Sequence, residues 1–333
     1  MNRSLLASIE EVTTVRFKKI AIFGVIASAT ALLLSPVAGS NAQKKQREVS
    51  SSGREVTILV TAHPRNQRMR EAASKLRPDD FSVREDRTPQ QIISVKRASE
   101  APLILAVLIQ DDLVTRVNNE LSRIKEFIRR LPEGSRVMIG YVTAGSLQVR
   151  QDFTTDRERA AESLRIVRSS ASSAPYNPYV EVIEALRRFD SQPAGRRMIL
   201  LVSDGLDTSH GFRSSSPGLS VDLSHAISEA QRRGVSVFSF FAPTVGLSDE
   251  SRLASNFGQG SLIRIGDETG GEAFTTGNDF VSFDPYFKEF DELLNLQWLI
   301  TYDSSTIGRS FRQVEVTTEQ DVHLHYAKGY APR

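Results

Sequence analysis

The sequence predicts an α/β protein: a mainly parallel sheet covered by helices on both faces, with a small β module formed from the N- and C-terminal flanks. Uninterrupted apolar runs at Leu103–Ile109 and Met198–Val202 are typical of strands buried on both faces. Segments with helical apolar spacing alternate with such runs, which favours parallel strands joined by crossovers. Both flanks instead show the period-two alternation of half-buried strands.

The charge balance excludes two classes of partner. The 333 residues carry 42 Lys and Arg against 40 Asp and Glu, and none is cysteine. Residues 1–42 hold four basic and two acidic side chains, which leaves 38 of each sign in residues 43–333. A folded part without basic excess argues against nucleic acid and anionic membrane surfaces as partners. The lack of cysteine excludes disulfides, thiolate metal sites and cysteine nucleophiles.

Residues 1–42 are typical of a signal peptide. The basic flank Arg16–Lys19 precedes an uncharged run over 20–34, and the small side chains of Ser40 and Ala42 precede the expected cut. The alternative is an uncleaved membrane anchor, for which the run is short because a spanning helix needs about 20 residues. We therefore expect a secreted or extracytoplasmic protein of the periplasm or cell envelope, which contacts a membrane only if this segment remains.

A polar stretch, 43–53, is the predicted linker to the N-terminal β segment, 54–98. In that segment apolar residues alternate over Val56–Val60 and Phe81–Val83, and Ile92–Val95 is a further short strand.

The predicted α/β domain spans 100–296, and its elements alternate in type. After the first strand they are a helix over 117–131, a strand over Val137–Val142, a polar edge strand over Gln148–Gln151, a helix near 160–167, a helix from Asn177-Pro178 to Phe189, the strand Met198–Val202, a helix over 223–230 ended by Gly234, the strand Val235–Phe241, and a helix over Phe280–Leu296. Two connections, Ser209–Ser220 and Pro243–Gly260, are expected to be long loops, which are either recognition loops or neutral surface insertions. The pairs Arg196-Arg197 and Arg232-Arg233 are expected to be solvated.

The C-terminal β segment, 297–333, again alternates, at Trp298–Tyr302, Val314–Val316 and Val322–Tyr326. Neither flank has enough strands to bury a face alone, because an isolated hairpin is marginal in water. We therefore expect the two flanks to meet in one mainly antiparallel module.

Polar side chains follow several predicted strands where the strands end. They occupy Gln110–Thr115, Ser172–Pro175 and Ser203–Thr208. Ligands of open parallel sheets bind at the carboxyl ends of the strands, and oxygen ligands of this kind suit Mg²⁺.

Several motifs in order resemble the von Willebrand factor type A (vWA) family, in its secreted bacterial branch with flanking β segments. The matching segments, over about residues 55 to 330, are Asp79–Asp86, Gln90–Ile93, Leu103–Ile109, Gln151–Asp156, Leu201–Thr208, Glu268–Phe274 and Tyr326–Tyr330. The resemblance implies a Rossmann-like fold and a protein-binding role.

The family's metal-ion-dependent adhesion site combines an Asp-x-Ser-x-Ser strand end, a hydroxyl from a second loop and an aspartate from a third. Carried over, the third-loop aspartate is Asp204 and the second-loop hydroxyl is Ser173. With Asp111 as the first aspartate, Thr115 replaces the second serine and Leu113 the first. Leucine cannot coordinate a cation, so we expect a degenerate site with Mg²⁺ bound weakly or not at all.

A second register of the motif, with its aspartate at Gln110, loses nearly every ligand, so we favour Asp111. Each position also has a structural interpretation: Thr115 as a helix cap, Ser173 as a loop residue and Asp204 as a turn former. His323 and His325 share one face of a predicted strand, but no third ligand is evident in the sequence, and exposed histidines are the simpler interpretation.

These observations predict a secreted, non-catalytic binding module for a protein partner, with no cofactor expected. The alternative is a divalent-metal-dependent hydrolase or metal-dependent adhesin using Asp111 and Asp204. No Gly-x-Ser-x-Gly element surrounds a serine, which argues against a serine hydrolase.

Overall fold

The computed structural model describes residues 54–99, 101–246, 251–275, 282–305, 308 and 310–331, which belong to one compact unit. The predicted signal peptide and linker lie outside the described residues. Within those ranges no helix has the length and apolar character needed to cross a membrane.

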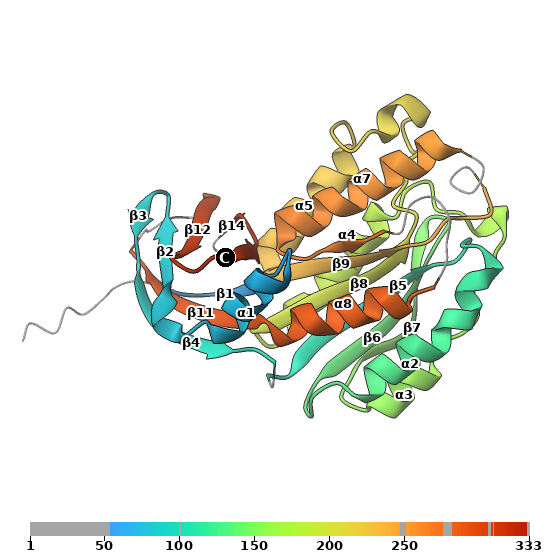
Figure 1. Cartoon of the computed structure of the whole chain (residues 1–333). Coiled ribbons are helices and arrows are strands. Elements are labelled where there is room, and N and C mark those ends of the chain that lie inside the picture. Colours follow the sequence, from blue (N-terminus) through green and yellow to red (C-terminus); the bar gives the residue numbers. More distant parts are fainter. Residues whose placement is uncertain are drawn as a thin grey trace, which may run out of the picture. The chain divides into compact units, whose positions relative to one another are not determined.

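A six-stranded sheet with the order β10-β9-β8-β5-β6-β7 forms the centre of the fold (Figure 1). Its strands are β5 (Leu103–Gln110), β6 (Arg136–Thr143), β7 (Ser146–Thr154), β8 (Arg196–Ser203), β9 (Val235–Phe241) and β10 (Ala273–Phe274). All neighbours pair in parallel except β7, which runs antiparallel along β6 as the predicted edge strand. The predicted fold class is confirmed.

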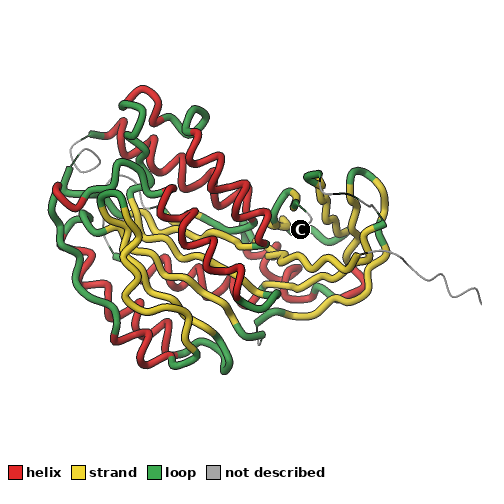
Figure 2. Tube along the Cα trace, turned by 180° about the vertical axis from the view of Figure 1, so that it is seen from behind, coloured by secondary structure: helices red, strands yellow, loops and turns green. Residues whose placement is uncertain are grey.

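Helices cover both faces of this sheet (Figure 2). One face packs against α2 (Leu121–Arg129), α3 (Arg157–Glu162) and α8 (Asp284–Asn295), and the other against α4 (Tyr179–Arg188), α5 (Val221–Arg233) and α7 (Arg252–Thr269). Alternate residues of β5 enter the two cores, Leu105 and Val107 on one side and Ala106 and Leu108 on the other. This double burial explains the continuous apolar run.

Short 3₁₀ turns accompany these elements: η1 (Pro78–Asp80), η2 (Thr115–Glu120), η3 (Ala171–Ser173), η4 (Phe189–Ser191) and η5 (Phe212–Ser215). Helix α5 begins at the cap Ser220, whose hydroxyl accepts from the Leu223 amide, and it ends at Gly234 in the left-handed conformation (φ 61°).

The two flanks of the chain form a β module of two four-stranded sheets, ordered β13-β1-β11-β4 and β14-β12-β2-β3. The elements are β1 (Arg54–His63), α1 (Gln67–Lys75), β2 (Phe81–Glu85), β3 (Thr88–Pro89), β4 (Gln91–Arg97), β11 (Gln297–Ser304), β12 (Arg312–Thr318), β13 (His323–Tyr326) and β14 (Gly329–Tyr330). Strand β1 pairs antiparallel with β11 from Arg54 opposite Ser304 to Thr61 opposite Gln297. The predicted joint module is confirmed.

The module has its own apolar core, to which the alternating residues of both flanks contribute, for example Val60, Val83 and Trp298. Among the described residues of the β module, Glu85 is the one fully buried carboxylate. It accepts hydrogen bonds from the hydroxyls of Tyr302, Ser304 and Tyr330 at 2.8–2.9 Å. Donors from both sheets thus compensate the burial of this charge.

Two sequence expectations are wrong. The expected loop Pro243–Gly260 contains the first half of helix α7. Arg196, Arg197 and Arg233 are buried: Arg196 donates to Gln297 Oε1 and the Leu294 carbonyl, and Arg197 to backbone carbonyls. Burial lowers the pKa of Arg196 to about 10. Carbonyls supplied by distant segments make this burial tolerable.

Glycine inside α7 lets this helix approach the turn after β8. A Cβ at Gly258 would lie 1.9 Å from the Asp204 carbonyl oxygen, and one at Gly205 would lie 2.5 Å from the Gly258 carbonyl. Both glycines therefore allow close backbone contact. The low helix propensity of glycine explains why the sequence pattern does not indicate a helix at Gly258.

We expect Gly258→Ala to lower the free energy of unfolding by about 3 kcal/mol, because backbone atoms must separate to admit the methyl group. Urea denaturation measures the change. Gly218→Ala is the matched control: its Cβ would meet nothing within 4 Å, and it should change stability by less than about 0.5 kcal/mol. Equal effects of the two substitutions would contradict the close-contact explanation.

Candidate functional site

The candidate site lies at the carboxyl ends of β5 and β8, two neighbouring parallel strands. Strand β5 has β6 on its other side, so the chain leaves β5 toward one edge and later returns to the opposite side with β8. Such a switch in strand order is where open α/β sheets bind ligands.

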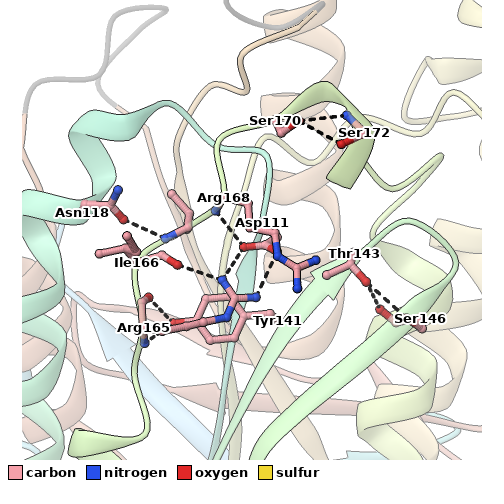
Figure 3. A network of polar contacts seen from close by, with 11 residues as sticks. Asp111, Asn118, Tyr141, Thr143, Ser146, Arg165, Ile166, Arg168, Ser170 and Ser172 are labelled. Atoms are coloured by element: carbon pink, nitrogen blue, oxygen red, sulfur yellow. Dashed lines mark hydrogen bonds and ion pairs between the residues drawn. The ribbon is translucent and has the colours of Figure 1, made fainter.

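Asp111 is fully buried and is held by arginine (Figure 3). The Arg165 guanidinium donates to Oδ1 at 2.7 Å and to Oδ2 at 2.9 Å, and it lies over the ring of Tyr141 at 3.9 Å. The Arg168 amide donates to Oδ1 at 3.0 Å, and its guanidinium lies 3.4 Å from Oδ2. Both carboxylate oxygens of Asp111 are therefore engaged by cationic or backbone donors.

Gln110 and Asp112, on either side of Asp111, belong to a different network. The Gln110 amide group donates to Asp112 Oδ1 at 2.9 Å, while its carbonyl oxygen accepts from the Ser203 hydroxyl at 2.5 Å and the Asp204 amide at 3.3 Å. Burial, with the nearby charge of Asp204, raises the pKa of Asp112 to about 7. The carboxylate that interacts with Asp204 is thus Asp112.

The loop after β9 covers this second network. Thr244 forms an isolated antiparallel bridge with Leu113, and the Val245 amide donates to the Asp112 carbonyl at 3.0 Å. The Thr244 hydroxyl donates to Asp204 Oδ2 at 3.2 Å. Leu113 is fully buried in the core. The backbone of the loop after β9 therefore covers the carboxyl groups of Asp112 and Asp204.

The structure gives Asp111 and Asp204, which the carried-over adhesion site would combine, separate sets of partners. An alternating strand end directs Asp111 to the side where Arg165 lies, and Gln110 and Asp112 to the side of Asp204. Thr115 is exposed at the start of η2, and Ser173 is buried in η3, where its carbonyl accepts from the Ala144 amide.

Sequence reasoning missed Arg165 and Thr244, and it set Gln110 aside. Arg165 lies 54 positions from Asp111, in a segment without a recognisable motif. The only signal was the second register considered above, in which Gln110 takes the position of the first aspartate.

A further group of possible metal ligands lies in the connection between β8 and α5. Ligand atoms of Asp207, His210 and Asp222 all fall within 4.8 Å of one another. However, Asp207 already accepts from the Ser209 amide and hydroxyl and from the Ser220 hydroxyl, at 2.5–3.0 Å. These hydrogen bonds order the connection and cap α5, and they account for the group without an ion.

Exposed apolar side chains gather at this same edge. We call seven of them the strand-end apolar set, and each is 36–74% exposed: Ile166, Tyr176, Val180, Leu219, Val221, Val245 and Leu253. Ile166 and Tyr176 lie between α3 and α4, Leu219 and Val245 lie in the connections after β8 and β9, and Val180, Val221 and Leu253 lie in the first turns of α4, α5 and α7. Among the described residues, the other exposed large apolar side chains are Ile93, Ile263 and Phe311.

Comparison with known proteins gives structural likenesses only. No protein-family model and no curated protein match the sequence. An aerotolerance-related membrane protein from Bacteroides fragilis is 13% identical over 59% of this chain and 99% of its own, with a TM-score of 0.41. BatB from Bacteroides thetaiotaomicron is 16% identical over 58% and 98%, with a TM-score of 0.39. The SpRpn10 VWA domain is 13% identical over 42% and 75%, with a TM-score of 0.30. At these values no shared activity or partner follows.

Proposed function

We propose that the chain is an exported, non-catalytic module that binds a protein partner through the strand-end edge of a vWA-like domain, without a divalent cation. The observation that carries this proposal is the bidentate ion pair between Arg165 and Asp111. An arginine here supplies the positive charge that a cation supplies in an intact adhesion site.

The neighbouring acids support the same conclusion. The Asp112 carboxyl group binds a proton readily near neutral pH, which lowers its value as a cation ligand. The bridge between Thr244 and Leu113 covers both the Asp112 and the Asp204 carboxyl groups. A cation would have to displace the guanidinium on one side or the β9 loop on the other.

The strand-end apolar set supports a protein partner. Single exposed apolar residues are common on any surface, but seven of the ten in the described chain belong to loops or helix starts at one edge of the sheet. Concentration of exposed apolar side chains marks protein-interaction surfaces. Loops on a rigid sheet are suited to this role.

The test is affinity capture from the native envelope fraction, with either Mg²⁺ or a chelator present. We expect the full chain to retain the same partner under both conditions, and Tyr176→Ser/Leu219→Ser to reduce retention at least ten-fold because two apolar contacts are lost. Ile93→Ser/Phe311→Ser, which changes exposed apolar residues of the β module, is the matched control and should retain the partner. Retention that requires Mg²⁺, or that survives the Tyr176 and Leu219 substitutions, would contradict the proposal.

A further inference from the structure

Three of the five histidines of the chain gather on one face of the β module. His63, at the end of β1, lies opposite His323 in the antiparallel register, and His325 is two residues further along β13. Directly opposite residues and residues two apart share a sheet face, so all three imidazoles lie on the same side. The third ligand that the sequence did not reveal is therefore contributed by another strand.

A carboxylate from the α/β part joins these histidines. Glu272 lies between α7 and β10, and its Oε2 is 3.4 Å from His63 Nε2 and 3.3 Å from His325 Nδ1. Two ligands bound at 2.0–2.1 Å to a tetrahedral ion are roughly 3.3 Å apart. Each separation by itself matches two neighbouring ligands of one zinc ion, but the ligand atoms of His63, His325 and Glu272 do not all lie within 4.8 Å of one another.

The cluster also contains buried polar atoms without hydrogen bonds. Both ring nitrogens of His63 and Oε2 of Glu272 are inaccessible to solvent and hold no hydrogen bond within the described residues. Such atoms are costly unless something satisfies them. Asp207 and its neighbours differ in this respect, because hydroxyl and amide donors already occupy Asp207.

We propose that His63, His325 and Glu272, with His323 beside them, form a site for a first-row divalent transition metal of the zinc class. Imidazole nitrogens with a carboxylate oxygen are a common zinc ligand set. The bound ion links β1 and β13 of the β module to the turn that follows α7, and it satisfies the buried Glu272 oxygen.

Binding requires one ring to turn. The His63 and His325 rings are stacked, with centroids 4.7 Å apart and planes 13° apart. A ligating lone pair lies in the plane of its ring, so two stacked rings cannot hold one ion between them. Neither nitrogen of His63 holds a hydrogen bond, so its rotation breaks the stacking contact and changes the 3.4 Å approach to Glu272 but breaks no hydrogen bond.

The surroundings give the ion access. His63 lines a surface pocket with Lys288, Glu289 and Glu292, through which an ion can arrive from solvent.

The experiment is calorimetric titration of the full chain, first stripped with a chelator, with Zn²⁺ at pH 7.5. We expect a dissociation constant of about 1 µM or tighter. His63→Ala/His325→Ala and, separately, Glu272→Gln should each weaken binding at least ten-fold. At one fixed Zn²⁺ concentration, the melting temperature of the unaltered protein should rise more than that of Glu272→Gln.

Matched variants distinguish the alternatives. His225→Ala, an exposed histidine on α5, should bind Zn²⁺ as the unaltered chain does. Glu272→Gln sits on a turn and keeps the shape of the side chain, so it tests the site even if the histidine variants unfold. Absence of binding overturns the proposal. So does binding that is unchanged in Glu272→Gln, or binding that is lost in Asp204→Asn or His210→Ala instead.

Discussion

Replacing Arg165 with methionine should lower the free energy of unfolding by about 3–5 kcal/mol, because it leaves the fully buried Asp111 carboxylate without its bidentate partner. The Arg165 side chain is 23% exposed, so solvent screens the pair only weakly. Methionine keeps much of the apolar contact with Tyr141, which isolates the electrostatic loss. Urea denaturation at pH 7 measures the change.

Arg168→Met is the control for Arg165. The Arg168 side chain is 54% exposed and its guanidinium is 3.4 Å from Asp111, while its backbone hydrogen bond survives the substitution. We expect a cost below about 1 kcal/mol. The double variant Asp111→Asn/Arg165→Met should recover part of the loss, because the buried charge is gone. A cost for Arg165→Met no greater than that for Arg168→Met would refute the role assigned to this pair.

Unlike Arg165→Met, Asp112→Asn should raise the free energy of unfolding, by about 2–4 kcal/mol at pH 8. The pKa of Asp112 rises from 3.8 to about 7 on folding. Below about pH 4 both states keep the proton. Between pH 4 and 7 only the unfolded state releases it, so the unaltered protein loses stability as the pH rises. Asparagine removes this loss and still accepts from Gln110.

Unfolding measured from pH 4 to 8.5 tests this effect. The advantage of Asp112→Asn should be greatest above pH 7 and should vanish near pH 4. Asp111→Asn, at the adjacent position, should instead destabilise the protein, because it weakens the ion pair with Arg165. An Asp112→Asn variant that is less stable at pH 8, or whose advantage does not change with pH, would contradict the burial-driven shift.

The pattern of apolar residues predicted those strands whose faces are each buried or exposed along their whole length. Leu103–Ile109 is apolar throughout because both of its faces are covered, and β1 alternates because one face of it is buried. The start of α7 was missed because Gly258 and Gly260 weaken helix propensity, and the contact that requires glycine at 258 comes from the distant turn at Asp204. Helix propensity reflects only the local free-energy cost of a residue in a helix, whereas the contact of Gly258 with the turn at Asp204 is a tertiary contact.

The candidate site was predicted as a place but not as a set of contacts. Strand ends located the acids correctly, since parallel strands end at one edge. Which acid faces Asp204 then depends on the register of the strand end. Side chains alternate between the two faces, so a shift of one residue exchanges Asp111 for Asp112. Arg165 could not be assigned to Asp111, because the pairing depends on how the segment after α3 returns over β5.

The pairing of β1 with β11 has a consequence for how the chain folds. Arg54 and Ser304, opposite each other in the register, are 250 positions apart in the sequence. A growing chain completes β1 long before its partner exists, and closing so long a loop has a large entropic cost. Such contacts raise the contact order and slow folding, so the β module is completed late. Until then, β1 presents unpaired strand edges of the kind on which aggregation begins.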